Sequence, residues 1–533
     1  MGSKIKYVES VKTKNSRIFL VFLLVILPGF ASLAQILPDT IERYLLSDVN
    51  RKDLKINYPE QIQQFYALRN YQTAWIQQKD STNLVNLLAT LSSAEDRGLS
   101  KTNYQYSFIS SFQNGNTRLE TQSDSLKAEI LFSDAAIHFY RDIVYGNTIP
   151  SFSYMGIKYI QDCYPIPEIL EQYISKHQLN SLPPFLSPRM PEVVALQNKI
   201  HWIVNIMKNE KFTEATVTLR TVSPANKALC NKLFQLGILN SIDENPSETI
   251  LKEKIRQAQY LFNLPVNGEL NQEVIRELNI PLKARLAQLT LSVNYYRWIS
   301  CLTQNQSVIV VNIPAAYLKV YRNNHVILEM RLVVGKPSTP TFTLTSVVNE
   351  VVVYPYWYVP PSIAVKELLP AIKRNPSFLD ANNYQVLNTA GKIIDPYSVN
   401  WHALSRNYFP YTIRQGTGCD NSLGLLKLNF YNPFGAYLHD TPSKNLFKQQ
   451  HRFFSHGCMR MEKPIELGHL ILKNNQIAID TLTEKGCLNN QSPITVTADV
   501  KMPVIVWYNP AGVDSTGTVL FFEDVYQKFN WMK

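Results

Sequence analysis

The residues best suited to catalysis lie in one short run, Ser455-His456-Gly457-Cys458-Met459-Arg460. Imidazole and guanidinium groups near a thiol are expected to favour its thiolate, which is the reactive form. Gly457 lets the backbone approach closely, and a neighbouring N–H can stabilise an oxyanion on an attacked carbonyl. Cys458 is therefore the candidate nucleophile, and Ser455, His456 and Gly457 are candidate supporting or oxyanion residues.

A second histidine, His439, lies nineteen residues before Cys458, in the run Tyr437-Leu438-His439-Asp440-Thr441-Pro442. It follows a strand-like segment, so that folding can bring it to the thiol and form a nucleophile–base pair. Spacing alone leaves open whether His439 or His456 is the base. Zinc binding by His439, His451, His456 and Cys458 is a competing interpretation. We disfavour it because no paired-ligand helix motif or metallopeptidase carboxylate accompanies these residues, and no metal site is predicted.

The block from Gly424 to Pro464 resembles the YkuD-type L,D-transpeptidases, particularly the large branch that carries a lid insertion. The residues that carry the resemblance are Leu438-His439-Asp440-Thr441-Pro442, Leu446-Phe447, Arg452 and Phe454-Ser455-His456-Gly457-Cys458-Met459-Arg460. The likeness covers most of residues 230–510. Met459 replaces a usually β-branched residue, and residues 415–418 lack an expected proline. Neither departure affects the nucleophile.

The resemblance also implies roles for the surrounding residues. It places the general base at His439 and gives supporting roles to His456, Gly457, Asp440 and Ser455. Arg460 then either holds a substrate carboxylate or braces its loop. Tyr437 and Trp357 either line the cleft or belong to the core of the domain.

The activity implied by the resemblance is peptidoglycan crosslinking. Cys458 would attack the carbonyl of the third residue of a tetrapeptide stem, release D-Ala and form a thioester, which an amine from a second stem resolves. No cofactor is needed. The expected partners are stem peptides, with other cell-wall synthesis proteins conceivable and nucleic acid not expected. Two alternatives stay open: a carboxypeptidase or endopeptidase that uses the same thioester, and a noncatalytic peptidoglycan-binding protein.

The hydrophobic periodicity indicates the elements that must position these residues. Apolar spacings of three and four predict helices over much of 35–229, and a helix, an Asn267-Gly268 turn and another helix resemble a peptidoglycan-binding module at 230–298. From residue 299 to 490 a period of two predicts a β-rich catalytic domain, with a helical lid insertion at 361–410. Residues 491–533 are expected to pack on the catalytic or scaffold domain. The predicted fold class is multidomain α+β.

The N-terminus indicates an exported chain. Basic residues, an apolar run at 18–27 and the small residues before Ala34 predict a signal peptide at 1–34, which directs the chain to the periplasm or cell envelope. An uncleaved anchor is the alternative. The net charge of +11 is spread without a basic block. There are six cysteines; if Cys458 stays a thiol, at most two bridges form and one further thiol remains.

Overall fold

The computed structural model describes residues 36–529 except 48–53, 78–80, 160–162, 220–225, 242–245, 475–478, 481, 483–485 and 489–490. The expected signal peptide at 1–34 lies outside these residues. Within the described ranges, no helix is both long and apolar enough to cross a bilayer.

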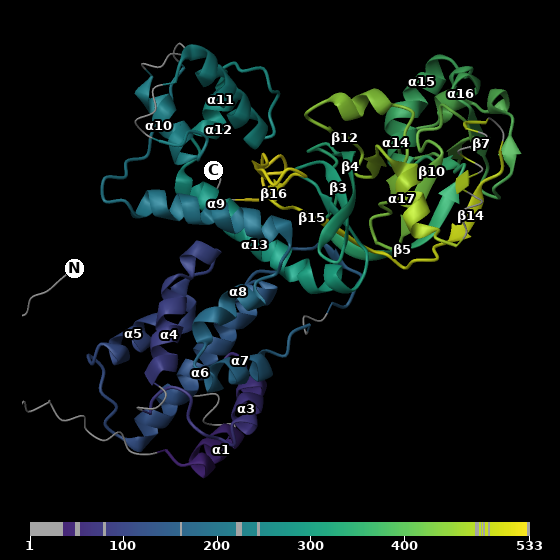
Figure 1. Cartoon of the computed structure of the whole chain (residues 1–533). Helices are drawn as coiled ribbons and strands as arrows, with labels where there is room; N and C mark the ends of the chain where they lie inside the picture. Colours follow the sequence, from purple (N-terminus) through teal and green to yellow (C-terminus); the bar gives the residue numbers. More distant parts are fainter. Residues whose placement is uncertain are drawn as a thin grey trace, which may run out of the picture.

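The N-terminal half is a bundle of helices around one central helix, shown in purple and blue in Figure 1. The central helix α6 is buried along most of its length, and the carboxylate of its Glu129 accepts hydrogen bonds from Tyr66 and from the backbone of Ala74 and Trp75. The residue pairs Phe65-Tyr66 and Ala74-Trp75 are thus joined in one core. The helices of the bundle are α1 Pro38–Leu46, α3 Pro59–Leu68, α4 Ser81–Ser92, α5 Tyr106–Gln113, α6 Gln122–Tyr145, α7 Ile166–Ser175 and α8 Leu182–Leu186. The next helix, α9 Pro191–Lys208, belongs to a second core.

A helical module follows, and a long helix connects it to the rest of the molecule. The module contains α10 Lys227–Gln235, α11 Glu248–Leu261 and α12 Gln272–Leu278. Its Asn267-Gly268 turn is fixed by the Gln259 amide oxygen, which accepts from both backbone N–H groups at 3.0 and 2.8 Å. Helix α13, Leu282–Asn305, runs on past the expected boundary at 298 and packs on both α6 and α9.

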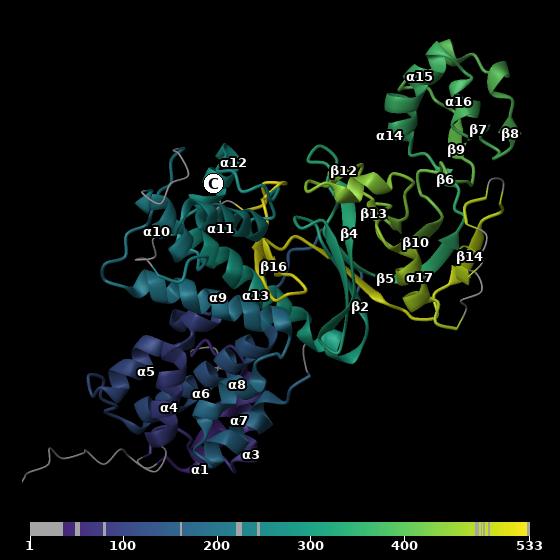
Figure 2. The same cartoon turned by 45° about the horizontal axis from the view of Figure 1, so that its top comes forward.

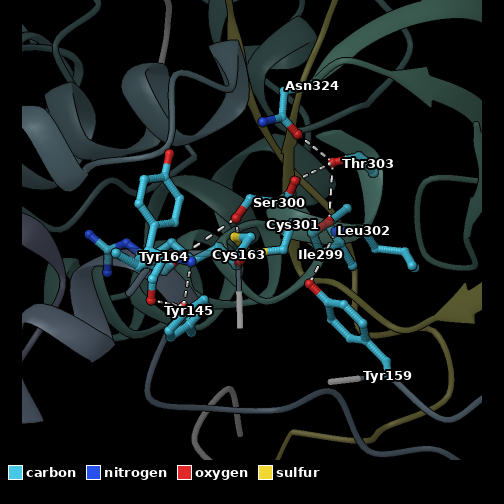
Figure 3. The surroundings of a disulfide bond; sticks show 12 residues. Tyr145, Tyr159, Cys163, Tyr164, Ile299, Ser300, Cys301, Leu302, Thr303 and Asn324 are labelled. Carbon is cyan, nitrogen blue, oxygen red and sulfur yellow. Dashed lines mark hydrogen bonds between the residues drawn. A yellow bond between two sulfur atoms is a disulfide. The ribbon is translucent and has the colours of Figure 1, made fainter. Parts of the chain in front are cut away.

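A disulfide between Cys163 and Cys301 ties α13 to the scaffold bundle (Figure 3). Beside it, the Tyr159 hydroxyl accepts from the Leu302 backbone at 3.1 Å. A second disulfide joins Cys419 and Cys487, whereas Cys230 and Cys458 remain thiols. The expected limit of two bridges and one further thiol is confirmed.

The catalytic region is built on a sheet whose strands close into a ring. The order runs β5-β10-β11-β13-β4-β3-β2-β15, and β15 pairs again with β5. Alternate residues of these strands fill the core with Val, Leu and Met side chains. Helix α17, Pro464–Ile471, packs against β10. The strands are β2 Val308–Asn312, β3 Tyr317–Arg322, β4 His325–Gly335, β5 Leu344–Val353, β10 Leu426–Phe430, β11 Leu438–His439, β13 Met459–Met461 and β15 Pro503–Trp507, with β1 Tyr154–Met155, β12 Phe453–Ser455 and β14 Ile494–Thr497 attached.

The insertion forms a lobe of its own, which Figure 2 shows beyond one end of the sheet. Besides the expected helices it contains a small sheet with the order β6-β9-β7-β8 and a separate apolar core. Its elements are β6 Trp357–Tyr358, α14 Pro361–Ile363, a π-helical turn Ala364–Leu368, α15 Leu369–Arg374, α16 Phe378–Ala381, β7 Tyr384–Leu387, β8 Ile393–Ile394 and β9 Thr412–Gln415.

The C-terminal segment contributes to two parts of the molecule. Strand β15 lies between β2 and β5, so the ring of strands closes only through residues beyond 490. The hairpin of β16 Ala511–Val513 and β17 Val519–Phe521 packs on the helical module instead. There, the Arg285 guanidinium lies 4.7 Å from the Phe262 ring centroid and 4.6 Å from that of Phe521.

Candidate active site

Three adjacent strands bring the predicted site residues to one face of the sheet. His439 on β11 is in register with Lys427 on β10 and with Arg460 on β13. Each of these residues has a sequence neighbour in its strand that is fully buried on the opposite face of the sheet: Leu428, Leu438 and Met459. Cys458 lies one residue before β13, beside Tyr437, whose carbonyl accepts from the Met459 backbone at 3.1 Å. Because side chains alternate along strands, Cys458, Tyr437, His439, Arg460 and Lys427 share this face.

Burial acts against the thiolate form of Cys458. Burial raises its pKa above the ordinary value, and the donor groups of Tyr437 and the charges of Lys427 and Arg460 offset only part of this effect. The groups that the sequence expects to favour the thiolate do lower the thiol pKa, but desolvation outweighs them. The sulfur lies 3.9 Å from the carbonyl oxygen of Gly435.

His439 is a buried, neutral imidazole with a fixed tautomer. Only 5% of the residue is exposed, and burial together with the nearby Arg460 charge lowers its pKa to about 3. Its Nδ1 lies 2.5 Å from the Asp440 carbonyl, to which it must donate. Nε2 is consequently the unprotonated nitrogen, in the form a base requires.

Asp440 supports His439 through its backbone, since its side chain is used elsewhere. The carboxylate accepts from the Leu425 N–H at 2.9 Å and pairs with Lys444. It also fills the space beside Gly424, where a Cβ would lie 2.4 Å from a carboxylate oxygen. Gly424 has a φ of +59°, so glycine is required there for two reasons.

The loop before Cys458 is held by hydroxyl groups. The Ser455 hydroxyl donates to the Cys458 carbonyl at 2.6 Å and accepts from the Gly457 N–H at 3.1 Å. Thr341 donates to the Gly457 carbonyl at 2.8 Å. Gly457 has a φ of +114°, which favours glycine. Because its N–H is already bonded to Ser455, Gly457 supports the loop rather than presenting a ready oxyanion donor in this state.

His456 points to the lid insertion. Its Nε2 lies 2.7 Å from a carboxylate oxygen of Glu367, in the π-helical turn Ala364–Leu368. The two histidines therefore differ in environment, because His439 is enclosed and His456 is partly exposed at the boundary with the lid. His451 pairs with Glu273 of the helical module at 3.5 Å. The histidines of the alternative zinc site thus face three different partners, and no metal-binding cluster is found within the described residues.

Arg460 and the two aromatic residues surround the thiol. Among the described residues, the Arg460 guanidinium has no hydrogen bond or ion pair, although its charge acts on both Cys458 and His439. Trp357 interacts with the Tyr437 hydroxyl, and Tyr437 in turn interacts with Cys458. Burial raises the Tyr437 pKa, so its hydroxyl stays protonated as a donor. Trp357 and Tyr437 thus connect the start of the lid insertion with the thiol.

Four residues near the site were not predicted from the sequence: Lys427, Glu350, Thr341 and Glu367. The Lys427 ammonium lies 4.1 Å from the Tyr437 ring centroid. Thr341 and Glu367 contact the 455–458 loop from distant parts of the chain. Period-two alternation places Lys427 on the face opposite Leu426 and Leu428, which is the one signal in the sequence that identifies any of the four.

Comparison with known proteins gives two family matches and several relatives. Residues 306–490 match the L,D-transpeptidase catalytic domain, YkuD, and residues 60–200 match the Scaffold domain. A Haemophilus influenzae protein named "Putative L,D-transpeptidase" is 36% identical over 220 residues, or 41% of this chain and 44% of that protein. The chain thus spans less than half the length of this curated relative.

Two solved structures are also similar over part of the chain. An L,D-transpeptidase from Mycobacterium smegmatis is 15% identical over 38% of this chain and 58% of its own, with a TM-score of 0.17. A mutant L,D-transpeptidase of Enterococcus faecium is 14% identical over 38% of this chain and 49% of its own, with a TM-score of 0.16. The chain thus contains an L,D-transpeptidase catalytic domain of the YkuD family, which follows a Scaffold domain.

Proposed function

We propose that this chain is a peptidoglycan L,D-transpeptidase that crosslinks stem peptides through a thioester on Cys458. Attack on the third-residue carbonyl of a tetrapeptide stem forms the thioester and breaks the amide to the terminal D-Ala. The thiol proton goes to Nε2 of His439 and then to the departing amine. An amine of a second stem displaces the thiol and forms the crosslink.

The observation that carries the proposal is the convergence of Cys458 and a neutral, tautomer-fixed His439 on one face of the sheet. A thiol and an unprotonated imidazole on the same face of the sheet are suited to proton transfer at the moment of attack. The unpaired Arg460 guanidinium offers a site for a substrate carboxylate. Export through residues 1–34 belongs to the same proposal, because the polymer lies outside the cytoplasmic membrane.

The test is incubation of the full chain with purified tetrapeptide muropeptide, followed by mass spectrometry of the products. We expect crosslinked dimer and free D-Ala. D-Ala release without dimer would favour the carboxypeptidase alternative, and no reaction would contradict the proposal. Cys458→Ala should abolish turnover, whereas Cys230→Ala, which removes the other thiol outside the disulfides, should leave it unchanged.

A further inference from the structure

An open groove of about 450 Å³ lies beside the thiol. Gly435, whose carbonyl oxygen lies 3.9 Å from the Cys458 sulfur, and Tyr437 line it near the nucleophile. From there its lining extends over β10 and β5 to Lys427 and Glu350. A ligand group that enters the groove from the reacting carbon therefore meets two charged side chains.

These two charges have opposite sign and are held apart. Lys427 is opposite Val352 and Asn429 is opposite Glu350, so Lys427 and Glu350 are diagonal neighbours on one face. Such neighbours lie about 7–8 Å apart. Lys427 lies over the Tyr437 ring, and Glu350 accepts from Asn429 at 3.2 Å. In the described part of the chain the two side chains form no ion pair with each other or with any other residue.

A separated ammonium and carboxylate are complementary to a group that carries both opposite charges. An amino-acid head group, with its carboxylate and ammonium on one carbon, satisfies Lys427 and Glu350 together through charge-assisted hydrogen bonds. A simple alkylamine satisfies only Glu350 and leaves Lys427 without an anion. The position of the groove next to Cys458 fits the side chain of the residue whose carbonyl is attacked.

We propose that this groove binds the side chain of the donor stem's third residue, and that this side chain ends in an amino-acid head group, as in meso-diaminopimelate. The inference rests on the proposed transpeptidase function. Lys427 binds the side-chain carboxylate, and Glu350 binds the side-chain ammonium. Both are specificity-determining residues of the donor site.

Two tetrapeptide donors that differ at the third residue test the assignment, one with meso-diaminopimelate and one with L-lysine. With D-Ala release as the readout, the wild-type chain should have a KM about tenfold lower for the diaminopimelate donor. Lys427→Met should raise that KM about tenfold and leave the lysine donor nearly unchanged. Glu350→Gln should raise KM for both donors. Lys463→Met, an exposed lysine that donates to the Glu329 carbonyl, is the matched control and should change neither.

Because the Lys427 charge also acts on Cys458, the alkylation rate of the thiol by iodoacetamide must be measured in each variant. If Lys427→Met slows alkylation and lowers kcat equally for both donors while their KM ratio is unchanged, the proposal is overturned. Equal KM values in the wild-type chain would also overturn it. Binding of both donors to Cys458→Ala, measured by calorimetry, separates the two claims. Absent turnover by the wild-type chain contradicts the proposed function, whereas equal binding of the two donors contradicts this inference.

Discussion

At the scale of single residues, the state of the Cys458 thiol decides how the reaction can start. Burial raises its pKa, whereas burial and Arg460 lower that of His439 to about 3. A resting thiolate–imidazolium pair is therefore disfavoured, and the proton must move as the carbon–sulfur bond forms. In this respect the site differs from cysteine sites whose thiolate is already formed before substrate binds.

The pH dependence of alkylation tests this state. A group with a raised pKa gains its thiolate only at high pH, so the rate of iodoacetamide alkylation of Cys458 should rise steadily through neutral pH and beyond its ordinary pKa of about 8.5. Tyr437→Phe removes a hydroxyl that lowers the thiol pKa and should shift the curve further upward. A plateau reached below pH 7 would show that the thiolate is already formed.

The assignment of His439 as base predicts unequal effects for the two histidines. His439→Gln should slow acylation by roughly 10²–10⁴-fold, the range typical of a lost acid–base group. His456→Gln, which removes a partly exposed contact with Glu367, should cost much less. Stopped-flow acylation with a tetrapeptide stem measures both. A larger loss for His456→Gln would reverse the assignment.

The sequence predicts this chemistry better than the contacts that support it. Cys458, His439 and the Ser455–Gly457 run were found because their residue types and order are themselves the signal. Thr341, Glu367 and Glu350 could not be found, since each reaches the site through strand register or loop packing over a long sequence separation. The effect of burial on the Cys458 thiol could not be predicted either, because a list of neighbouring groups does not show how much of the sulfur is removed from water.

At the scale of elements, the lid insertion reaches the surroundings of Cys458 at two places. Glu367 of the π-helical turn binds His456, and Trp357 at the start of the insertion interacts with Tyr437. We interpret residues 361–410 as a lid whose position is coupled to the loop that carries Cys458.

Hydrogen exchange should show the lid less protected than β2 and β10. Glu367→Gln weakens the hydrogen bond with His456 and should increase exchange in 361–374 and raise the KM for stem peptides several-fold. Asp380→Asn is the matched control, because the Asp380 carboxylate accepts a hydrogen bond from the Tyr397 hydroxyl inside the lid at 2.5 Å. A lid as protected as the strands, and unchanged by substrate, would contradict this role.

The element pattern also shows where sequence reasoning stops. The period-two alternation predicted β2, β3 and β4, but it did not place β15 between β2 and β5, because a pattern gives the faces of a strand and not its neighbours. The small sheet of the lid was missed for a similar reason. Its strands have two to four residues, too few for periodicity to appear.

At the scale of the whole molecule, α13 connects the scaffold to the sheet, and the Cys163–Cys301 disulfide fixes that connection (Figure 3). The two cysteines are 138 residues apart in the sequence. A disulfide that closes so long a loop strongly restricts the conformations of the unfolded chain. Replacing both cysteines by alanine should destabilise the chain by about 2–4 kcal/mol. Urea unfolding monitored by tryptophan fluorescence measures the change.

The second disulfide provides the comparison for this experiment. Replacing Cys419 and Cys487 by alanine removes a bond inside the catalytic half, beyond the lid strand β9. Loss of the Cys163–Cys301 bond should leave Cys458 alkylation nearly unchanged, because that bond lies in the scaffold and α13. If the variant without the Cys163–Cys301 bond has an unchanged unfolding midpoint, or if its Cys458 loses reactivity, the scaffold and the catalytic region are connected differently.

The most direct test of the central claim is to trap the acyl-enzyme. Wild-type chain and Cys458→Ala are mixed with a tetrapeptide stem, quenched in acid after short times and weighed by intact-protein mass spectrometry, with peptide mapping of any adduct. We predict an adduct equal to the stem minus its terminal D-Ala, located on Cys458, labile to hydroxylamine and absent from Cys458→Ala. An adduct on another residue, or crosslinking by Cys458→Ala, would contradict the thioester mechanism.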